Sequence, residues 1–219
     1  MLKVIGDVHG KFEQYENIVK GCDFSLQLGD LGFDYNKIDV DDKTHKFFPG
    51  NHDNYDTCFE QPGCLGDFGK AHLGGVQFFF IRGAFSIDWR MRTDYEMKTG
   101  FKCRWNNEQL MGEEIEKAYD EYKRVCPDIM ITHSCPTAVG RNIGSPKTLQ
   151  YFGYDSKTFN TNTQTLLEKC HKFHQPKLWI FGHFHRSVNI IMRETRFICL
   201  AELECIDIDK DGKILRDFP

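Results

Sequence analysis

The chain has 219 residues, of which 40% are hydrophobic and 27% charged, as is usual for a globular protein with a substantial core. The formal net charge of -4 argues against nonspecific binding to nucleic acid, which needs clustered positive charge. No apolar run approaches the roughly 20 residues of a membrane span. The first residues show no signal-peptide pattern, and the nine cysteines form no C-x-x-C pair, so we expect a cytoplasmic protein with no membrane partner.

The first third of the chain alternates short apolar runs with one helical pattern. Residues 11–21 place Phe12, Tyr15, Ile18 and Val19 at helical spacing and stop at a glycine, which predicts a helix. The predicted strands of this part are residues 2–6, 24–30, 45–51, 70–73 and 75–85.

Residues 83–106 break this rhythm, because they mix aromatic residues and arginines without a clean period. We predict a long functional loop here, inserted at the rim of a substrate site. Its arginines are either ordinary surface charge or contacts for a phosphate. Residues 107–125 follow as a predicted helix that is acidic at its start and basic at its end, which suits the helix dipole.

The rest of the chain ends in strand pairs. Residues 128–134 and 177–182 predict buried strands, and residues 163–173 predict a helix between them. Antiparallel strands are predicted within residues 187–192, 196–209 and 212–218. Helices that alternate with strands early, and strand pairs late, indicate an α/β fold with a mixed sheet or two sheets. We treat residues 1–219 as a single domain.

Five of the predicted strands end in polar signatures. The sequences at these ends are "GDVHG", "GD", "GNHD", "THS" and "GHFH". Open α/β sheets place ligands just beyond the carboxyl ends of their strands, so these side chains are expected at one rim. The candidate ligands are Asp7, His9, Asp30, Asn51, His133, His183 and His185.

The donor types point to divalent metal ions. Aspartate, histidine and asparagine supply oxygen and nitrogen donors without thiolate, which suits Mn, Fe, Zn or similar ions. Seven donors are too many for one tetrahedral ion. If one aspartate bridges, the seven side chains serve two ions and leave positions open for water and substrate.

The order D-x-H, G-D, G-N-H-D, H and G-H-x-H resembles that of the calcineurin-like metallophosphoesterases. The match runs from Asp7 to His185, and "FSID" after a glycine bend is similar to a subgroup of small microbial and phage-type members. The resemblance implies a two-sheet β-sandwich flanked by helices, in four αββα layers, with a dinuclear site at the strand ends.

The resemblance also implies a role for each matching residue. Asp30 would bridge the two ions, and His52 would be the general acid for the leaving oxygen. The first ion would be held by Asp7, His9 and His185, and the second by Asn51, His133 and His183.

Such a site suits hydrolysis of phosphate mono- or diesters. Two ions about 3.5–4 Å apart bind a phosphoryl oxygen and lower the pKa of a shared water, so that hydroxide attacks in line. A histidine then supplies the proton that the leaving alkoxide needs near neutral pH. We expect Mn to serve in vitro, with Fe, Zn, Ni, Co or Mg as alternatives, and a nucleotide, another small phosphoester or a phosphoprotein as substrate.

One departure concerns the serine/threonine phosphoprotein phosphatase branch of the family. In that branch the G-D motif, the second of the series, is extended to G-D-x-V-D-R-G. This chain has "GDLGFDYN" at the same place and lacks the arginine. The aspartate that orients the histidine in that branch therefore has no assigned counterpart here, and either Asp53 or Asp34 is a candidate to polarise His52. We name Asp53, the neighbour of His52 in sequence, as the second catalytic candidate. The residues expected to bind substrate are Asn51, Arg90 and Arg92.

Two alternatives to a small-molecule phosphoesterase stay open. One is phosphoprotein phosphatase activity, and the other is a non-catalytic scaffold that keeps the fold. A scaffold is expected to lose ligands or the acid histidine, whereas this chain keeps all of them.

Two further patterns are assigned no chemistry. "KCHKFHQP" offers Cys170, His171 and His174 but lacks a fourth zinc ligand, so it is predicted to be a solvated helix face. "DIDKDG" lacks the acidic twelfth residue of a calcium loop, so it is predicted to be a tight turn between strands.

Overall fold

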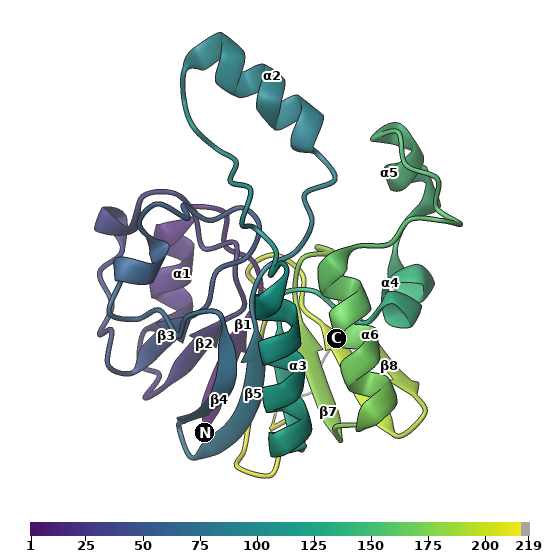
Figure 1. The fold of residues 1–219 in the computed structure, drawn as a ribbon. Helices are drawn as coiled ribbons and strands as arrows, with labels where there is room; N and C mark the ends of the chain where they lie inside the picture. The colour runs from purple at the N-terminus through teal and green to yellow at the C-terminus, as the bar shows by residue number, and fades with distance from the viewer. Residues whose placement is uncertain (216–219) are drawn as a thin grey trace.

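The computed structural model describes residues 1–215 and arranges them as two β-sheets between layers of helices (Figure 1). The first sheet has the strand order β10-β1-β2-β3 and the second has the order β4-β5-β6-β7-β9-β8. The first sheet consists of β1 (Leu2–Ile5), β2 (Ser25–Gln27), β3 (His45–Phe47) and β10 (Cys205–Ile208). The second consists of β4 (Phe68–Leu73), β5 (Val76–Ile81), β6 (Ile129–Thr132), β7 (Leu178–Phe181), β8 (Val188–Met192) and β9 (Thr195–Cys199). The helices are α1 (Phe12–Val19), α2 (Trp89–Thr99), α3 (Glu113–Val125), α4 (Thr137–Ile143), α5 (Pro146–Tyr151) and α6 (Asn162–Phe173).

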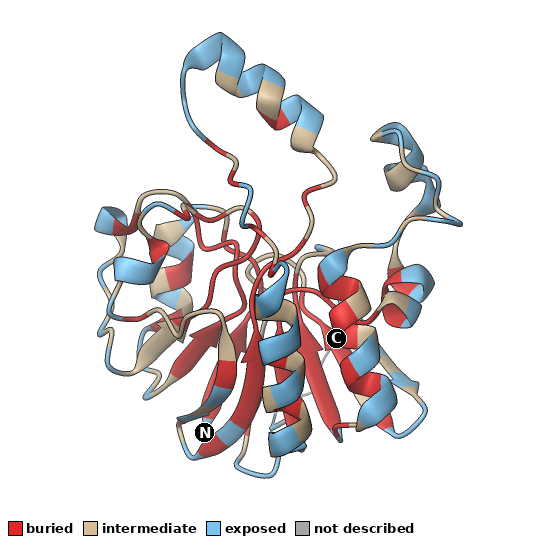
Figure 2. Ribbon diagram, viewed as in Figure 1, coloured by how far each residue is buried: buried red, intermediate tan, exposed pale blue. Residues whose placement is uncertain are grey.

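Strand β5 shows how the layers form. Its residues alternate in direction, as in any strand, so that Phe78 and Phe80 join the core between the sheets while Phe79 and Ile81 pack under the helices. A strand buried on both faces reads as a nearly continuous apolar run, which in β5 is interrupted only by the exposed Gln77. Figure 2 shows the strands in the middle of the sheets as largely buried, whereas the edge strands β4 and β8 carry exposed residues.

Helices cover the outer face of each sheet. Tyr15 and Val19 of α1 pack with Ile5 and Phe47 on the first sheet. Side chains of α3, α4 and α6 pack on the second sheet, among them Tyr122, Val139 and Leu167. These layers confirm the expected two-sheet sandwich flanked by helices.

Parallel pairing places the functional loops together. Strands β1, β2 and β3 are mutually parallel, and so are β5, β6, β7 and β9. The loops that follow these strands therefore gather at one edge, from which α2 and α5 project (Figure 1).

The expectation of a loop over residues 83–106 is wrong in its central part, because α2 occupies Trp89–Thr99. This helix carries no apolar stripe, and its one buried residue is Arg92, so the periodicity that announces a helix is missing. Figure 2 shows α2 as mostly exposed. We call residues 84–108, which carry it, the α2 arm.

The structure differs from several smaller predictions. The helix predicted over 107–125 begins at Glu113, and the short helices α4 and α5 were not predicted. Cys170 and His171 do not form a solvated face, because α6 turns both toward the sheet, where His171 Nε2 lies 3.1 Å from Thr195 Oγ1.

The structure agrees in part with the predictions for the C-terminal residues, which are a tight turn at 207–212 and a strand within 212–218. The tight turn near "KDG" is present, with the backbone N–H of Gly212 donating to Asp209 O. Ile214 makes a single bridge to Ile208, and residues 216–219 of the last predicted strand lie outside the described residues. Within residues 1–215, none of the helices combines the length and the apolar character that crossing a membrane requires.

Candidate metal centre

The seven predicted ligands all lie just past the carboxyl ends of parallel strands. Asp7 and His9 follow β1, Asp30 follows β2, Asn51 follows β3, His133 follows β6, and His183 and His185 follow β7. Both sheets therefore contribute to one location, as the sequence predicted from separate strand ends.

Six of the seven form two groups that could each hold a metal ion. The first group is Asp7, His9, Asp30 and His185, and the second is Asp30, His133 and His183. Within each group the donor atoms lie within 4.8 Å of one another. Asp30 belongs to both groups, which is the geometry that a bridging carboxylate requires.

Nitrogen and oxygen atoms converge closely in the first group. His185 Nε2 lies 3.0 Å from Asp7 Oδ2 and 2.9 Å from His9 Nε2. His9 Nε2 in turn lies 3.7 Å from Asp30 Oδ2. Four side chains thus direct their donor atoms at a common point.

In the second group, hydrogen bonding fixes the histidine tautomer. His133 Nδ1 lies 2.8 Å from the carbonyl oxygen of Leu28, which only accepts, so Nδ1 carries the proton. The Nε2 atom of a neutral His133 then has a free lone pair, and it lies 3.0 Å from Asn51 Oδ1 and 3.3 Å from Asp30 Oδ1. Three acceptors so close together repel unless a cation lies among them, so this donor set fits a metal ion.

Backbone strain concentrates at the candidate ligands. Seven non-glycine residues among residues 1–215 have positive φ, and four of them are predicted ligands: His9, Asp30, His183 and His185. Such conformations cost on the order of 1–3 kcal/mol each and persist where the surroundings enforce them. Strain of this kind at four predicted ligands is typical of a functional site.

The glycines that precede two ligands leave room for carboxylates. A Cβ at Gly50 would lie 2.2 Å from Asp30 Oδ1, and a Cβ at Gly182 would lie 2.3 Å from Asp7 Oδ1. The "GN" and "GH" pairs of the sequence therefore have a steric cause, because any side chain there would displace a candidate ligand.

The electrostatics of Asp30 and His183 favour the protonation states that a metal needs, whereas the hydrogen bond with Asp7 raises the pKa of His185. Burial opposes ionisation of Asp30, but neighbouring imidazoles, His133 above all, hold the pKa of Asp30 well below its usual range. Burial and the nearby His133 lower the pKa of His183 to about 3. At neutral pH the carboxylate is therefore charged and the imidazole neutral, so both have lone pairs to donate.

His52 lies beside the centre with a carboxylate that the sequence did not single out as its partner. His52 Nε2 lies 3.7 Å from Asp88 Oδ2. Partial burial lowers the pKa of His52, while the charges of Asp30 and Asp88 oppose this shift. Asp88 is the last residue of the "FSID" stretch, but no spacing rule connects it to His52, which lies 36 positions earlier in the chain.

The two aspartates considered as partners of His52 have other contacts. Asp34 forms an ion pair with Lys37 at 3.3 Å. Asp53 is buried, and its carboxylate accepts four hydrogen bonds, from the backbone N–H groups of Asp30, Gly32 and Gly50 and from Tyr35 Oη. Burial raises the pKa of Asp53 to about 6, and the bonds from the glycine N–H groups oppose the rise. Through these hydrogen bonds Asp53 links the loop that carries Asp30 to the loop that carries Asn51.

The two arginines named for substrate binding differ in environment. Arg90 is exposed on α2. Arg92 is 6% exposed, and its guanidinium contacts Glu108, Ser86 and the carbonyl oxygen of Asn51. The direct contact with substrate that the sequence suggested for both stays a prediction, while Arg92 already contacts the backbone of Asn51, a predicted ligand.

The sequence and the fold were compared with those of known proteins, and the sequence matches one protein family. The sequence model of the family described as calcineurin-like phosphoesterase matches residues 2–187. No curated protein matches the chain at the sequence level. Among solved structures, the phosphopantetheinyl hydrolase of Mycobacterium tuberculosis is similar in fold, with a TM-score of 0.54 and 13% identity over 92% of this chain and 89% of that one. A protein of Thermus thermophilus has a TM-score of 0.49 and 12% identity over 92% and 90% of the two chains.

Proposed function

The chain belongs to the calcineurin-like phosphoesterase family, and on that premise we propose that it is a dinuclear metal-dependent hydrolase of phosphate mono- or diesters. The observation that carries the proposal is the convergence of the candidate ligands into two groups that share Asp30. A binding module of the same fold has no need for two adjacent groups of converging oxygen and nitrogen donors.

The residues that would hold the ions follow from the two groups. Asp30 would contact both ions. The first ion would be held by Asp7, His9 and His185, and the second by Asn51, His133 and His183. When bound, two such ions supply Lewis acidity for the attack of water on phosphorus, and we propose Mn²⁺ as the ion that serves in vitro.

The side chains themselves hold the ligands in place and supply a proton. Asp53 joins the loop after β2 to the loop after β3, which keeps Asp30 and Asn51 at a fixed separation. His52 would protonate the leaving oxygen, because an imidazole is suited to proton transfer near neutral pH. Asp88, 3.7 Å from His52 Nε2, would orient that ring.

Substrate selection is proposed to rest on the surroundings of the centre. We propose a small phosphoester, such as a nucleotide, as the substrate class. Arg90 is exposed on the α2 arm and is the candidate for direct contact with the substrate. Asn51 borders the second group, so its amide would also lie near a bound phosphoryl group.

The direct test is turnover of p-nitrophenyl phosphate and bis-p-nitrophenyl phosphate by the purified chain with added Mn²⁺. The proposal expects turnover of at least one of them, abolished by a chelator and restored by Mn²⁺. Stoichiometric metal binding without turnover of either compound would favour the scaffold instead. A panel of nucleotides, other small phosphoesters and phosphopeptides then ranks the substrate classes.

A further inference from the structure

We propose that Ser86, Arg92 and Glu108 of the α2 arm are positioning residues that fix the orientation of Asn51, so that binding of the second metal ion depends on the arm. The inference rests on the proposed function and deepens it. In addition to lying beside the metal centre, the arm would orient one of the ligands of the second ion.

Ser86 is the centre of this arrangement. The residue is 2% exposed, and its hydroxyl donates to Glu108 Oε2 at 2.6 Å. The same oxygen accepts from Asn51 Nδ2 at 2.9 Å and from Arg92 Nη1 at 2.6 Å. A hydroxyl has one proton and two lone pairs, so its bonding capacity is filled.

This bonding decides which way the Asn51 amide faces. Because the proton of Ser86 goes to Glu108, the hydroxyl can only accept from Asn51, and the amide must present its nitrogen there. Asn51 Oδ1 is thereby turned to the opposite side, 3.0 Å from His133 Nε2. Without Ser86 the amide can flip and direct its NH₂ group, which cannot bind a cation, at the second group.

A buried ion pair holds Ser86 in place. Arg92 Nη2 lies 2.8 Å from Glu108 Oε1, and the two residues are 6% and 3% exposed. Glu108 Oε1 also accepts from the backbone N–H of Trp105 at 2.9 Å, and Arg92 donates to the carbonyl oxygens of Asn51 and Cys103. Buried charges are costly unless they are paired and hydrogen-bonded. Both terminal nitrogens of Arg92 and both carboxylate oxygens of Glu108 are bonded, while Arg92 Nε has no partner among the described residues. The paired network therefore favours this arrangement over one in which the two charges separate.

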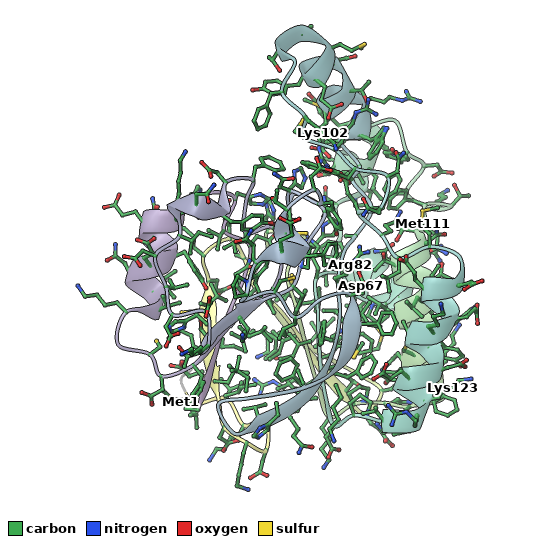
Figure 3. All side chains as sticks on the ribbon, turned by 60° about the vertical axis from the view of Figure 1, so that its left-hand side comes forward. Met1, Asp67, Arg82, Lys102, Met111 and Lys123 are labelled. Atoms are coloured by element: carbon green, nitrogen blue, oxygen red, sulfur yellow. The ribbon has the colours of Figure 1, made fainter. Side chains whose placement is uncertain are left out.

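The base of the arm is fixed to the sheets. Arg82, which directly follows β5, donates to Asp67 Oδ1 at 2.5 Å and to the carbonyl oxygen of Asn107 at 2.8 Å. Ala84 N–H donates to Glu108 O at 3.2 Å, so the two ends of the arm are joined. Figure 3 shows Arg82 and Asp67 together below the arm, on which Lys102 is labelled.

The effect should be selective for one ion. The bonds of Ser86 reach Asn51, which belongs with the second group. In the first group, Asp7 has a different support, because the backbone N–H of His183 lies 3.0 and 3.1 Å from its two carboxylate oxygens. Loss of Ser86 should therefore lower the affinity of the chain for the second ion and leave its affinity for the first ion unchanged.

The test is a titration of the metal-free chain with Mn²⁺ by calorimetry, together with electron paramagnetic resonance, which distinguishes a coupled Mn pair from a single ion. Wild-type chain should bind two ions. Ser86→Ala should bind the first ion normally and the second about 10- to 100-fold more weakly, the usual cost of losing a support behind a metal ligand. Ser86→Thr, which keeps the hydroxyl, should restore the pair signal.

A matched control lies on the same arm. Glu96 pairs with Arg104 at 2.6 Å, and Glu96→Gln breaks this pair without touching the bonds of Ser86. It should bind both ions as the wild type does. If Ser86→Ala is unfolded at the assay temperature, Glu108→Gln serves instead, with the same selective weakening expected.

Two outcomes would overturn the inference while the proposed function stands. One is a folded variant with wild-type affinity for both ions, and the other is equal loss of both ions. A wild-type chain that binds fewer than two Mn²⁺ would instead contradict the proposed function, and the inference with it.

Discussion

Replacement of Gly182 by alanine should displace the Asp7 carboxylate and disable the first metal group. Gly182 directly precedes His183, and its φ lies outside the left-handed region, so alanine is compatible with the backbone there. The added Cβ, however, would lie 2.3 Å from Asp7 Oδ1. The next residue that it meets, Leu28 with its Cβ at 3.8 Å, is at an ordinary contact distance. The variant therefore has one steric conflict, and that conflict is with a candidate ligand.

The size of the effect follows from this overlap. To reach an ordinary contact of about 3.4 Å, the carboxylate must retreat by ~1 Å. Metal–ligand distances tolerate only about 0.2 Å, so Asp7 would cease to bind. A misplacement of about 1 Å also costs on the order of 10²-fold in rate. We expect one Mn²⁺ instead of two and a fall in kcat/KM of about 100-fold.

The assay combines metal analysis after desalting with turnover of p-nitrophenyl phosphate. Gly140→Ala is the matched control, because its Cβ would lie 2.6 Å from Gln164 Nε2, the end of a flexible side chain. This variant should keep both ions and its activity. A Gly182→Ala chain that binds two ions and turns over substrate at the wild-type rate would refute the steric account of the "GH" pair.

Three further variants test other parts of the account. His52→Ala should lower turnover about 10²- to 10⁴-fold with normal metal content, and loss of metal would show that its role is wrongly assigned. Asp88→Asn should keep both ions and slow phenyl phosphate more than p-nitrophenyl phosphate, whose leaving group needs a proton less; equal slowing of the two would argue against orientation of His52. Burial raises the pKa of Tyr15 to about 12, so the unfolded chain loses that phenol proton first and stability should fall above about pH 10. Tyr15→Phe should show a smaller fall in unfolding free energy between about pH 9 and 11 by urea denaturation, and an unchanged fall would contradict this.

The parts of the fold that the sequence predicted well are those governed by local rules. Strand β5 is buried on both faces, so "VQFFFI" reads as an apolar run whatever surrounds it. The candidate ligands follow strand ends, where a glycine and a polar residue mark the exit from the sheet. Parallel pairing then brings these ends together, which is why a list of motifs anticipated a spatial cluster.

The parts that were missed depend on partners distant in sequence. Helix α2 has no apolar stripe, because its buried residue is Arg92, whose partner Glu108 lies 16 positions away. Asp88 meets His52 only because the α2 arm returns to the centre. Asp53 stands next to His52 in sequence, yet its carboxylate turns to backbone N–H groups of two loops. Adjacency along the chain therefore does not predict the direction in which that side chain points.

The central claim is that one carboxylate serves two metal ions, and Asp30→Asn tests it most directly. Asp30 belongs to both candidate groups, and its carboxylate also accepts from the backbone N–H of His52 at 2.7 Å. Calorimetric titration with Mn²⁺ should show two ions bound to the wild-type chain, weakened binding of both in Asp30→Asn, and no turnover by the variant. A folded Asp30→Asn chain that still binds two Mn²⁺ ions with wild-type affinity would contradict the account.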